Sequence, residues 1–374
     1  MKRILLLFAL VALLAPCTAL AAAPIKIGLM APLTGSFASE GQDMQKLVEL
    51  LVEEVNKAGG INGTPVQLIV EDDGSIPRSA ANAANRLVSK GVEFVIGTYG
   101  SAVTEASQDV YDEAGVVQVA TGSTSIRLTT KGFQRFFRTC PRDDEQGRVA
   151  AETMANLGFK KIALLHDNSA YSKGLAEETL RIIKDQGKVE VIFYDALQPN
   201  ERDYSAILTK IKGIAPEAIL FTGYYPEAGM LLRQMAEMKW SVPMVGGDAA
   251  NNLGLVEIAG VEASRGYRFL SPPMPGDLDS PRAKAFLEAY EIKYGSPPSS
   301  IWSVIAGDAF NVLVAAITAK GPDPKAVTDY LHKELKDFDG LSGSISFSPE
   351  GDRVGDLYRL YEVNDKGIFV LQNN

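Results

Sequence analysis

Ser101 and the residues around it have the types and spacing of an anion-binding site. The apolar segment Phe94–Gly97 is predicted to be a short buried strand, and a helix is expected to run from Ser101 to about Ala114. The first N–H groups of a helix have no partner within the helix, and together with the Ser101 hydroxyl they suit a carboxylate. The alternative is that Ser101 only caps its own helix, a common role for serine.

A second turn with hydroxyl groups favours the binding interpretation. Val116–Ala120 is predicted to be another apolar strand, and it ends in Thr121–Ser125, a turn of glycine and residues with hydroxyl groups. In open α/β sheets, ligands bind beyond the carboxyl ends of the strands. Both turns are therefore candidates for one ligand site.

The sequence shows no recognisable catalytic, dinucleotide-binding or metal motif. Gly28–Gly35, after the first predicted strand, lacks the G-x-G-x-x-G spacing. His166 and His332 are the only histidines, and no G-x-S-x-G motif accompanies them, so His166 is predicted to be a structural side chain at a strand end. Asp72–Asp73 is interpreted as a strand-end turn because no alternating carboxylates follow it. We expect no enzyme activity, no cofactor and no metal site.

The N-terminal segment Met1–Ala23 has the features of a cleaved secretory signal peptide. Lys2 and Arg3 precede an apolar run, which ends in small residues suited to cleavage. Cys17 suggests a lipoprotein, but Pro16 stands where a lipidation motif has a small residue, so a lipid anchor is not expected. The mature chain then keeps one cysteine and has no internal disulfide.

The composition is that of an acidic globular protein. Removal of two basic residues with the signal peptide changes the formal net charge from −9 to −11, which disfavours nucleic acid as a partner. Hydrophobic residues make up 46% of the chain, and no apolar stretch after the signal is expected to be long enough for a membrane helix. A mature length of about 350 residues suggests two domains.

Strands and helices are predicted to alternate along the mature chain, in two successive series. This alternation is typical of doubly wound parallel sheets. The first series comprises the two strands above, the helix after Ser101, and Ile25–Met30, Gly41–Ala58, Val66–Val70 and Arg78–Lys90. The second comprises Asp143–Leu157, Ile162–Leu165, Tyr171–Gln186, Val189–Tyr194, Tyr204–Lys212, Ala218–Phe221, Pro226–Met238 and Met244–Val245.

A cluster of helix-breaking residues, Ser271–Gly276, follows the second series and is a candidate connection between domains. Beyond it, the sequence predicts three helices and then three short strands. These elements are Pro281–Tyr294, Ser299–Ala319, Pro324–Leu335, Ser344–Phe347, Leu357–Val363 and Ile368–Leu371.

Several segments in order along the chain resemble a known family, the leucine/isoleucine/valine-binding proteins, which are type I periplasmic receptors of branched-chain amino acid ABC importers. The resemblance covers essentially the whole mature chain. The segments are Ile25–Gly35, Val55–Gly63, Glu71–Asp73, Val95–Gly97, Leu128–Phe133, Phe137–Thr139, Asp144–Gly147 and Phe221–Glu227.

The resemblance implies two α/β lobes joined by a hinge, with an amino acid ligand in the cleft between them. Lobe one would comprise residues 24–140 and 272–350, and lobe two residues 141–271 and 351–374. Such a protein is a periplasmic monomer, and closure of its lobes is what the inner-membrane permease recognises. The implied function is capture of a branched-chain or a larger or polar amino acid for import.

The family's ligand contacts match residues of both predicted lobes. The carboxylate clamp falls on Ser101 and Thr124, and the Gly122 carbonyl would accept from the α-ammonium group. From lobe two, Tyr171 and Tyr224 would face the cleft. The alternative for the two tyrosines is that they are ordinary interface aromatics.

The family's acidic partner of the ammonium group matches Asp248, which is one methylene shorter than the usual glutamate. The alternative is that Asp248 caps a helix near Asn252. Glu40 stands where branched-chain binders have a tyrosine, and Tyr99 stands where they have leucine. These departures suggest a ligand side chain that is polar, cationic or larger than leucine, unless Glu40 points to solvent.

The positions of the family's disulfide are occupied by Ser75 and Gly100, a further departure. Two other classes of function stay open. The same fold serves in ligand-sensing receptors for amides or small aromatic acids, and an enzyme on this fold is disfavoured only by the missing catalytic motif.

Overall fold

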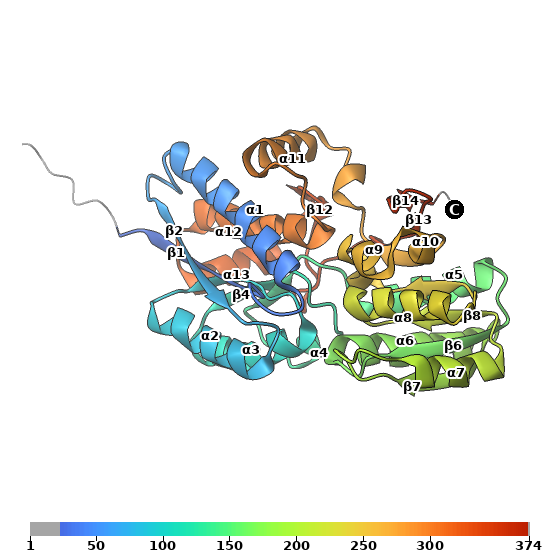
Figure 1. Ribbon diagram of the computed structural model, residues 1–374. Coiled ribbons are helices and arrows are strands. Elements are labelled where there is room, and N and C mark those ends of the chain that lie inside the picture. Colours follow the sequence, from blue (N-terminus) through green and yellow to red (C-terminus); the bar gives the residue numbers. More distant parts are fainter. Residues whose placement is uncertain (1–22, 373–374) are drawn as a thin grey trace, which may run out of the picture.

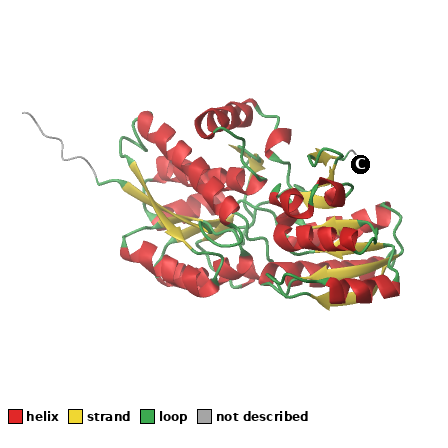
Figure 2. Cartoon of the chain, viewed as in Figure 1, coloured by secondary structure: helices red, strands yellow, loops and turns green. Residues whose placement is uncertain are grey.

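The structure is a computed structural model that describes residues 23–372. These residues form two α/β lobes that lie side by side (Figure 1). In each lobe, helices flank a central sheet (Figure 2). Most of the predicted signal peptide, including Cys17, lies outside the described residues.

Lobe one is built on a sheet of five parallel strands in the order β2-β1-β3-β4-β5. Its strands are β1 (Ile25–Ala31), β2 (Val66–Asp72), β3 (Phe94–Ile96), β4 (Val117–Ala120) and β5 (Phe136–Arg138). Its helices are α1 (Ala38–Lys57), α2 (Pro77–Ser89), α3 (Ser101–Glu113), α4 (Arg127–Thr130), α11 (Pro281–Tyr294), α12 (Ile301–Lys320) and α13 (Pro324–Lys333). The strand order reverses between β1 and β3, and α3 follows that point directly.

Lobe two is built on a sheet with the order β14-β13-β10-β9-β8-β6-β7. Its strands are β6 (Lys161–His166), β7 (Glu190–Ala196), β8 (Ala218–Phe221), β9 (Met244–Gly246), β10 (Arg268–Ser271), β13 (Arg359–Val363) and β14 (Phe369–Leu371). Its helices are α5 (Asp143–Asn156), α6 (Ala170–Gln186), α7 (Ser205–Ile214), α8 (Tyr225–Glu237), the 3-10 helix η1 (Asp248–Ala250), α9 (Gly254–Ala259) and α10 (Val261–Ser264).

Two strands of the lobe-two sheet depart from the predicted parallel winding. The C-terminal strands β13 and β14 run antiparallel to their neighbours, so the lobe-two sheet is mixed. Antiparallel strands can be joined by a short connection, and β13 and β14 form such a pair at the edge of the sheet. The predicted doubly wound parallel sheet is confirmed for strands β6 to β10, and β13 and β14 extend it by antiparallel pairing.

Each sheet is covered on both faces by helices whose apolar residues form separate cores. In lobe one, α1 and α12 cover one face of the sheet and α2 and α3 cover the other. In lobe two, α7 and α8 cover one face, and α5 and α6 cover the other. Burial on both faces explains why the strands are continuous apolar runs in the sequence.

Helix α12 is an apolar stretch of the length that the sequence analysis did not expect after the signal peptide. It has 20 residues and a mean hydropathy of 1.7, so it is long and apolar enough to cross a membrane. However, 83% of its apolar window is buried inside the protein, and α12 packs against α1 in lobe one. It is a core helix whose apolar character comes from burial on all sides.

Some short elements were not predicted. Strand β10 and helices α9 and α10 lie between residues 254 and 271, where the sequence indicated no element. The predicted run Ser344–Phe347 corresponds in part to β12 (Gly343–Ile345), which forms a two-stranded sheet with β11 (Phe338–Gly340). Elements of three to six residues are too short to show a clear periodicity.

A buried charge network lies where the chain passes between the lobes. The Arg138 guanidinium donates from Nε to Asp352 Oδ1 at 2.5 Å and from Nη1 to the carbonyls of Ser123 and Ser125, both at 2.9 Å. Arg142, between β5 and α5, donates to Asp352 Oδ2 at 2.6 Å. Arg138 is completely buried, so this network fixes the turn that contains Thr124 against two of the chain crossings.

We propose a small shift in the boundary between the lobes near the C-terminus. Isolated β-bridges join Arg138 to Asp352 and Phe347 to Arg353, which keeps residues 352 and 353 attached to lobe one. The third crossing would then run from about Val354 to Tyr358, just before β13.

Candidate ligand-binding site

Ser101 links the two polar turns of lobe one. It is the first residue of α3, it is 1% exposed, and its Oγ accepts a hydrogen bond from the Ser125 N–H at 3.2 Å. Gly100, not Ser101, is at the N-cap position of α3. The alternative that Ser101 only caps its helix is therefore wrong. Since the Ser101 oxygen already accepts one bond, its hydroxyl hydrogen remains available to an anion.

Thr124 and Gly122 lie in the turn after β4. The Thr124 carbonyl accepts a hydrogen bond from the Asp143 N–H at 3.0 Å. The Thr124 hydroxyl is buried and has no hydrogen-bond partner among residues 23–372. A Cβ at Gly122 would come within 2.7 Å of the Tyr99 ring, so this close approach requires glycine.

Asp248 lies at the centre of a buried hydrogen-bond network in lobe two. Its Oδ1 accepts from the Tyr171 hydroxyl and its Oδ2 accepts from the Tyr358 hydroxyl, both at 2.8 Å. The backbone N–H of Asp248 donates to Gln146 Oε1 at 3.1 Å. Neither η1 nor α9 has a side-chain cap, so the alternative that Asp248 caps a helix is wrong.

Asp143 is a second buried carboxylate close to Asp248. It is 1% exposed, and neither of its oxygens has a hydrogen bond of ordinary geometry within residues 23–372. Burial raises the pKa of Asp143 well above its usual range and the charge of Asp248 raises it further, while the nearby Thr124 hydroxyl, although not in hydrogen-bond geometry with Asp143, partly offsets both. Burial also raises the pKa of Asp248 to about 6, against hydrogen bonds from the two tyrosines. A cation would stabilise both carboxylates in this environment.

Aromatic rings from both lobes meet beside these polar groups. The Tyr224 ring, at the start of α8, lies 5.3 Å from the Tyr171 ring and 6.1 Å from the Tyr99 ring. The Phe37 ring from lobe one lies 4.6 Å from Tyr224 and 5.8 Å from Tyr99. Aromatic side chains of both lobes therefore pack together beside the polar turns of lobe one and the Asp248 carboxylate of lobe two.

Glu40 joins the two lobes by a buried hydrogen bond. Its Oε1 accepts from Asn252 Nδ2 of lobe two at 2.7 Å, and its Oε2 accepts from the Ser300 hydroxyl of lobe one. Glu40 is 1% exposed, so the alternative that it points to solvent is wrong. Burial raises the pKa of Glu40 to about 7, against the hydrogen bonds from Ser300 and Asn252.

The first turn of α1 and the loop before it make further contacts with lobe two. The Tyr225 hydroxyl donates to the Ser36 carbonyl at 3.0 Å, and the Ser36 hydroxyl donates to Asn200 Oδ1 at 3.0 Å. With the Glu40–Asn252 bond, these contacts form what we call the inter-lobe latch. The latch consists of side chains on each lobe that hold the lobes together directly.

Asn252→Ala should open the ligand-free protein. The substitution removes a hydrogen bond to a carboxylate, which is worth about 1.5–3 kcal/mol, and leaves the rest of the latch intact. We expect a larger radius of gyration for the variant by small-angle X-ray scattering. Asn85→Ala is the control, because Asn85 donates only to the Ala81 carbonyl within α2. Equal radii for both variants and the wild type would contradict a role of the latch in closure.

The structure brings most of the predicted site residues together between the lobes, and it adds others that the sequence analysis missed. Glu40 lies near Tyr99, and its two oxygens accept hydrogen bonds from Asn252 and Ser300. The residues brought together are Ser101, Gly122, Thr124, Tyr99, Tyr171, Tyr224 and Asp248. The missed residues are Asp143, Gln146 and Tyr358.

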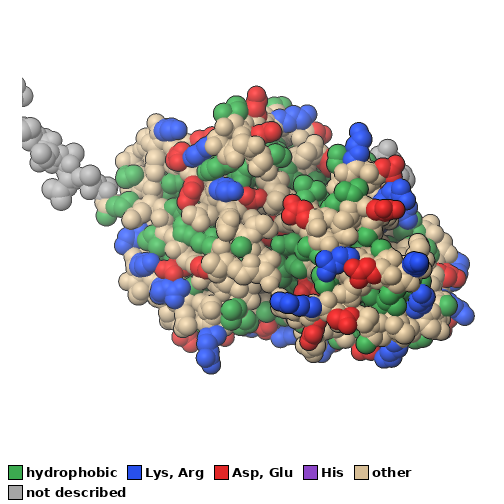
Figure 3. Space-filling model, in the orientation of Figure 1, with side chains coloured by type: hydrophobic (Ala, Val, Ile, Leu, Met, Phe, Trp, Pro, Cys, Tyr) green, Lys and Arg blue, Asp and Glu red, His purple; other side chains and the backbone are tan. Residues whose placement is uncertain are grey.

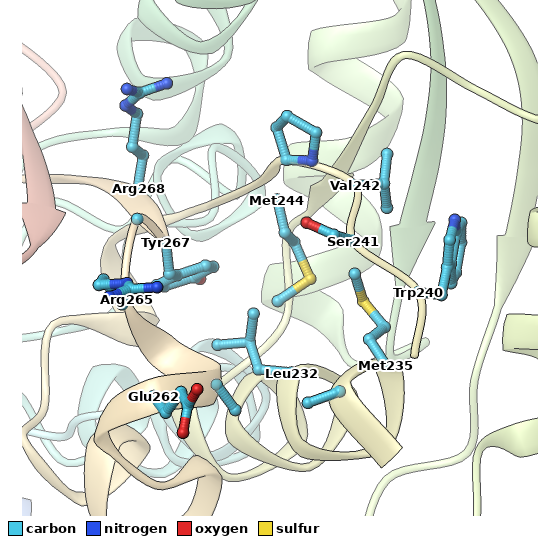
Figure 4. Close-up of a pocket in the computed structure, with 14 residues that line it drawn as sticks. Leu232, Met235, Trp240, Ser241, Val242, Met244, Glu262, Arg265, Tyr267 and Arg268 are labelled. Atoms are coloured by element: carbon cyan, nitrogen blue, oxygen red, sulfur yellow. The ribbon is translucent and has the colours of Figure 1, made fainter. Parts of the chain in front are cut away.

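Two hollows on the surface help to locate the site. One, of about 360 Å³, lies between the lobes and is lined by Phe37 and Gly100 of lobe one and by Asp167 and Tyr224 of lobe two. The other, of about 420 Å³, lies on lobe two around Trp240 (Figure 4) and contains none of the predicted site residues. On the face shown in Figure 3, acidic and basic side chains are interspersed over both lobes.

Other titratable residues fit a structural role. His166 is buried, its Nδ1 accepts from the Asn168 N–H at 3.0 Å, and burial lowers its pKa. This agrees with the prediction of a structural histidine at a strand end. Across residues 23–372, histidine, cysteine and acidic side chains form no group of three that could hold a metal ion.

Comparison with known proteins gives consistent matches over almost the whole chain. The family model described as "Periplasmic binding protein" matches residues 24–367. The Leu/Ile/Val-binding protein homolog 3 of Brucella melitensis is 35% identical over 94% of each chain. The leucine-, isoleucine-, valine-, threonine- and alanine-binding protein of Pseudomonas aeruginosa is 33% identical, over 92% of this chain and 91% of the other.

A solved structure of the branched-chain amino acid transporter substrate-binding protein LivJ from Streptococcus pneumoniae, in complex with isoleucine, is similar to this chain. It superposes with a TM-score of 0.84 at 32% sequence identity, over 94% of this chain and all of the other. Two α/β lobes with a buried polar site between them define a solute-binding receptor. The chain belongs to the periplasmic binding protein family, and its relatives are Leu/Ile/Val-binding proteins.

Proposed function

We propose that this protein is the periplasmic receptor of an ABC importer, and that it captures an α-amino acid between its lobes and delivers it to a membrane permease. The observation that carries this proposal is the pairing of an anion-binding edge in lobe one with buried carboxylates near lobe two. The edge is formed by Ser101 and Thr124, and the carboxylates are Asp143 and Asp248. An α-amino acid has the matching pair of charges on one carbon atom.

The ligand carboxylate would bind to the first N–H groups of α3 and to the Ser101 and Thr124 hydroxyls. The α-ammonium group would bind Asp248 and the Gly122 carbonyl, and its charge would stabilise the ionised form of Asp248 that burial disfavours. Tyr171 would orient the Asp248 carboxylate through its 2.8 Å hydrogen bond. Rings such as Tyr224 would exclude water from the bound ligand.

The relatives support the amino acid class, and the predicted signal peptide supports a periplasmic location. Proteins named for leucine, isoleucine, valine, threonine and alanine binding match this chain over nine tenths of its length. The proposed role is binding and delivery without catalysis. The site offers paired charges and hydroxyls, without a nucleophile activated by a base.

Ser101→Ala should weaken binding of the amino acid that this protein captures by roughly 10- to 100-fold. A hydrogen bond to a charged group contributes about 1.5–3 kcal/mol, and the variant loses that bond while keeping the backbone of α3. The ligand would be found by a thermal-shift screen of ligand-stripped protein against the amino acids, followed by isothermal titration. A ligand of the native state raises the melting temperature.

Ser89→Ala is the matched control, because the Ser89 hydroxyl donates only to the Arg86 carbonyl at the end of α2. It should bind the ligand as the wild type does. If the screen finds an amide or a small aromatic acid and no amino acid, the proposal of an amino acid receptor fails and the ligand-sensing alternative replaces it. Unchanged affinity in Ser101→Ala would remove Ser101 from the site.

A further inference from the structure

Two hydrogen-bond donors beside Glu40 are buried without partners. The Tyr99 hydroxyl and the Trp302 Nε1–H have no hydrogen-bond partner among residues 23–372, and their residues are 2% and 1% exposed. Their rings are 6.1 Å apart in an edge-to-face arrangement. A buried polar group left unpaired costs about 1–3 kcal/mol, so both donors favour a partner with an acceptor.

The surroundings of Tyr99 place its ring within the enclosed region between the lobes. A Cβ at Gly122 would lie 2.7 Å from the Tyr99 ring, so the ring packs on the turn that precedes Thr124. The Tyr224 ring of lobe two lies 6.1 Å from the Tyr99 ring. Burial raises the pKa of the Tyr99 hydroxyl well above its usual range, and the nearby charge of Glu40 raises it further. The ring therefore lies beside a turn of the proposed ligand site, and the charges of Glu40 and Asp248 both act on its hydroxyl.

Trp302 is connected to the same end of the site through Ser300. The Ser300 hydroxyl oxygen accepts from the backbone N–H of Trp302 at 3.3 Å, and the same hydroxyl donates to Glu40. Trp302 lies two residues after Ser300, whose hydroxyl binds the Glu40 carboxylate. Trp302, in the first turn of α12, is thus linked to Tyr99 by ring contact and to Glu40 through Ser300.

We propose that this protein selects an α-amino acid whose side chain ends in an uncharged oxygen acceptor, an amide or a hydroxyl, which Tyr99 and Trp302 bind through their free donors. This inference rests on the proposed function and specifies its ligand. Tyr99 and Trp302 are then specificity-determining residues. The aliphatic side chains of leucine and valine would leave both donors unpaired.

Charged side chains fit this end of the site less well. A carboxylate would be repelled by Glu40, Asp143 and Asp248, all of which are buried. A cationic side chain carries only donors, so it would leave the Tyr99 and Trp302 donors unpaired. Burial also raises the pKa of Glu40 to about 7, so its charge at neutral pH is incomplete. A neutral acceptor avoids both costs.

The test is a comparison of dissociation constants by isothermal titration on ligand-stripped protein. The probes are L-glutamine, L-asparagine and L-threonine as neutral polar ligands, L-leucine and L-valine as aliphatic ligands, and L-glutamate and L-lysine as charged ligands. We expect at least one neutral polar amino acid to bind tenfold or more tightly than L-leucine. Sites built to pair a ligand's polar group discriminate against analogues that lack it.

Tyr99→Phe removes one donor and keeps the ring. It should weaken binding of the best neutral polar ligand about tenfold and leave the affinity for L-leucine unchanged or higher. Tyr267→Phe is the matched control: the Tyr267 hydroxyl is also buried without a partner among residues 23–372, but its residue lines the lobe-two hollow of Figure 4. That control should leave every affinity unchanged.

Each result decides between the proposals. If L-leucine, L-valine or a charged amino acid binds as tightly as every neutral polar one, this inference is overturned, while the importer receptor remains. A Tyr99→Phe variant with wild-type selectivity overturns it equally. If no amino acid binds, the proposed function fails together with the inference. Trp302→Phe removes the second donor and tests it in the same way. If Trp302→Phe does not fold, Tyr99→Phe alone decides the test.

Discussion

Asp248→Asn is expected to weaken binding of the captured amino acid at least a hundredfold. The proposed ammonium group would lose its buried anionic partner, and breaking one side of a buried ion pair costs about 3–5 kcal/mol. That cost corresponds to roughly a hundredfold to a thousandfold or more in the dissociation constant. Isothermal titration with the amino acid identified in the screen measures the change directly.

Two further measurements distinguish loss of the contact between Asp248 and the ammonium group from unfolding of the variant. The ligand-free Asp248→Asn protein should melt no lower than the wild type at neutral pH, because the variant removes a buried charge. Glu237→Gln is the control, since Glu237 is an exposed carboxylate at the end of α8. If Asp248→Asn keeps wild-type affinity and Asp143→Asn loses it, the ammonium group binds Asp143 and our assignment to Asp248 is wrong.

The ligand-free protein should lose stability as the pH rises from about 4 to about 7. Burial raises the pKa of Asp248 to about 6 and that of Glu40 to about 7. Between its unfolded and its folded pKa, each carboxyl keeps a proton in the native state that the unfolded chain has already released. The native state binds more protons in this range, so the free energy of unfolding falls as the pH increases, by about 3 kcal/mol for each group.

Urea unfolding of ligand-free protein at pH 5 and at pH 7.5 measures this effect. Other groups also titrate in this range, so the informative quantity is the difference between the wild type and the double variant Glu40→Gln with Asp248→Asn. The double variant should lose much less stability over the same pH interval. An identical pH dependence in both proteins would show that these two carboxyls ionise normally.

Ligand binding should have the opposite pH dependence. An ammonium group favours the ionised form of Asp248, so binding releases a proton wherever Asp248 is protonated in the free protein. The affinity should therefore decrease as the pH falls from 7 to 5, and Asp248→Asn should remove this trend.

The long elements of the fold were predictable because their patterns are strong. Helix α11 begins and ends as expected, since Ser280 caps its start and Gly295 adopts the left-handed conformation after its end. The strand-to-helix junction at Ser101 was predictable as well, because apolar strands that end in glycine and hydroxyl residues occur where parallel sheets bind ligands. The short β10, α9 and α10 had no comparable pattern.

Asp143, Gln146 and Tyr358 could not be predicted, because they join the site only where the chain passes between the lobes or folds within lobe two. Asp143 is at the start of α5, where an acidic residue is ordinary at a helix N-terminus. Tyr358 lies beside a short apolar strand and has no distinguishing neighbour in sequence. Glu40 was identified from the sequence as a departure from the family's tyrosine. Its bonds to Asn252 and Ser300 were not predictable, because they join positions more than 200 residues apart.

The clamp made by Arg138 has a consequence for the kinetics of capture. Arg138 holds the carbonyls on both sides of Thr124, and its partner Asp352 anchors it to a chain crossing. The turn is thus already ordered in the folded protein. Ligand binding therefore does not have to supply the free energy of ordering this turn. Capture then divides into an encounter with lobe one, whose rate grows with ligand concentration, and a closure step whose rate does not. At high ligand concentration, closure of the lobes would therefore limit the rate at which the closed, ligand-bound receptor forms.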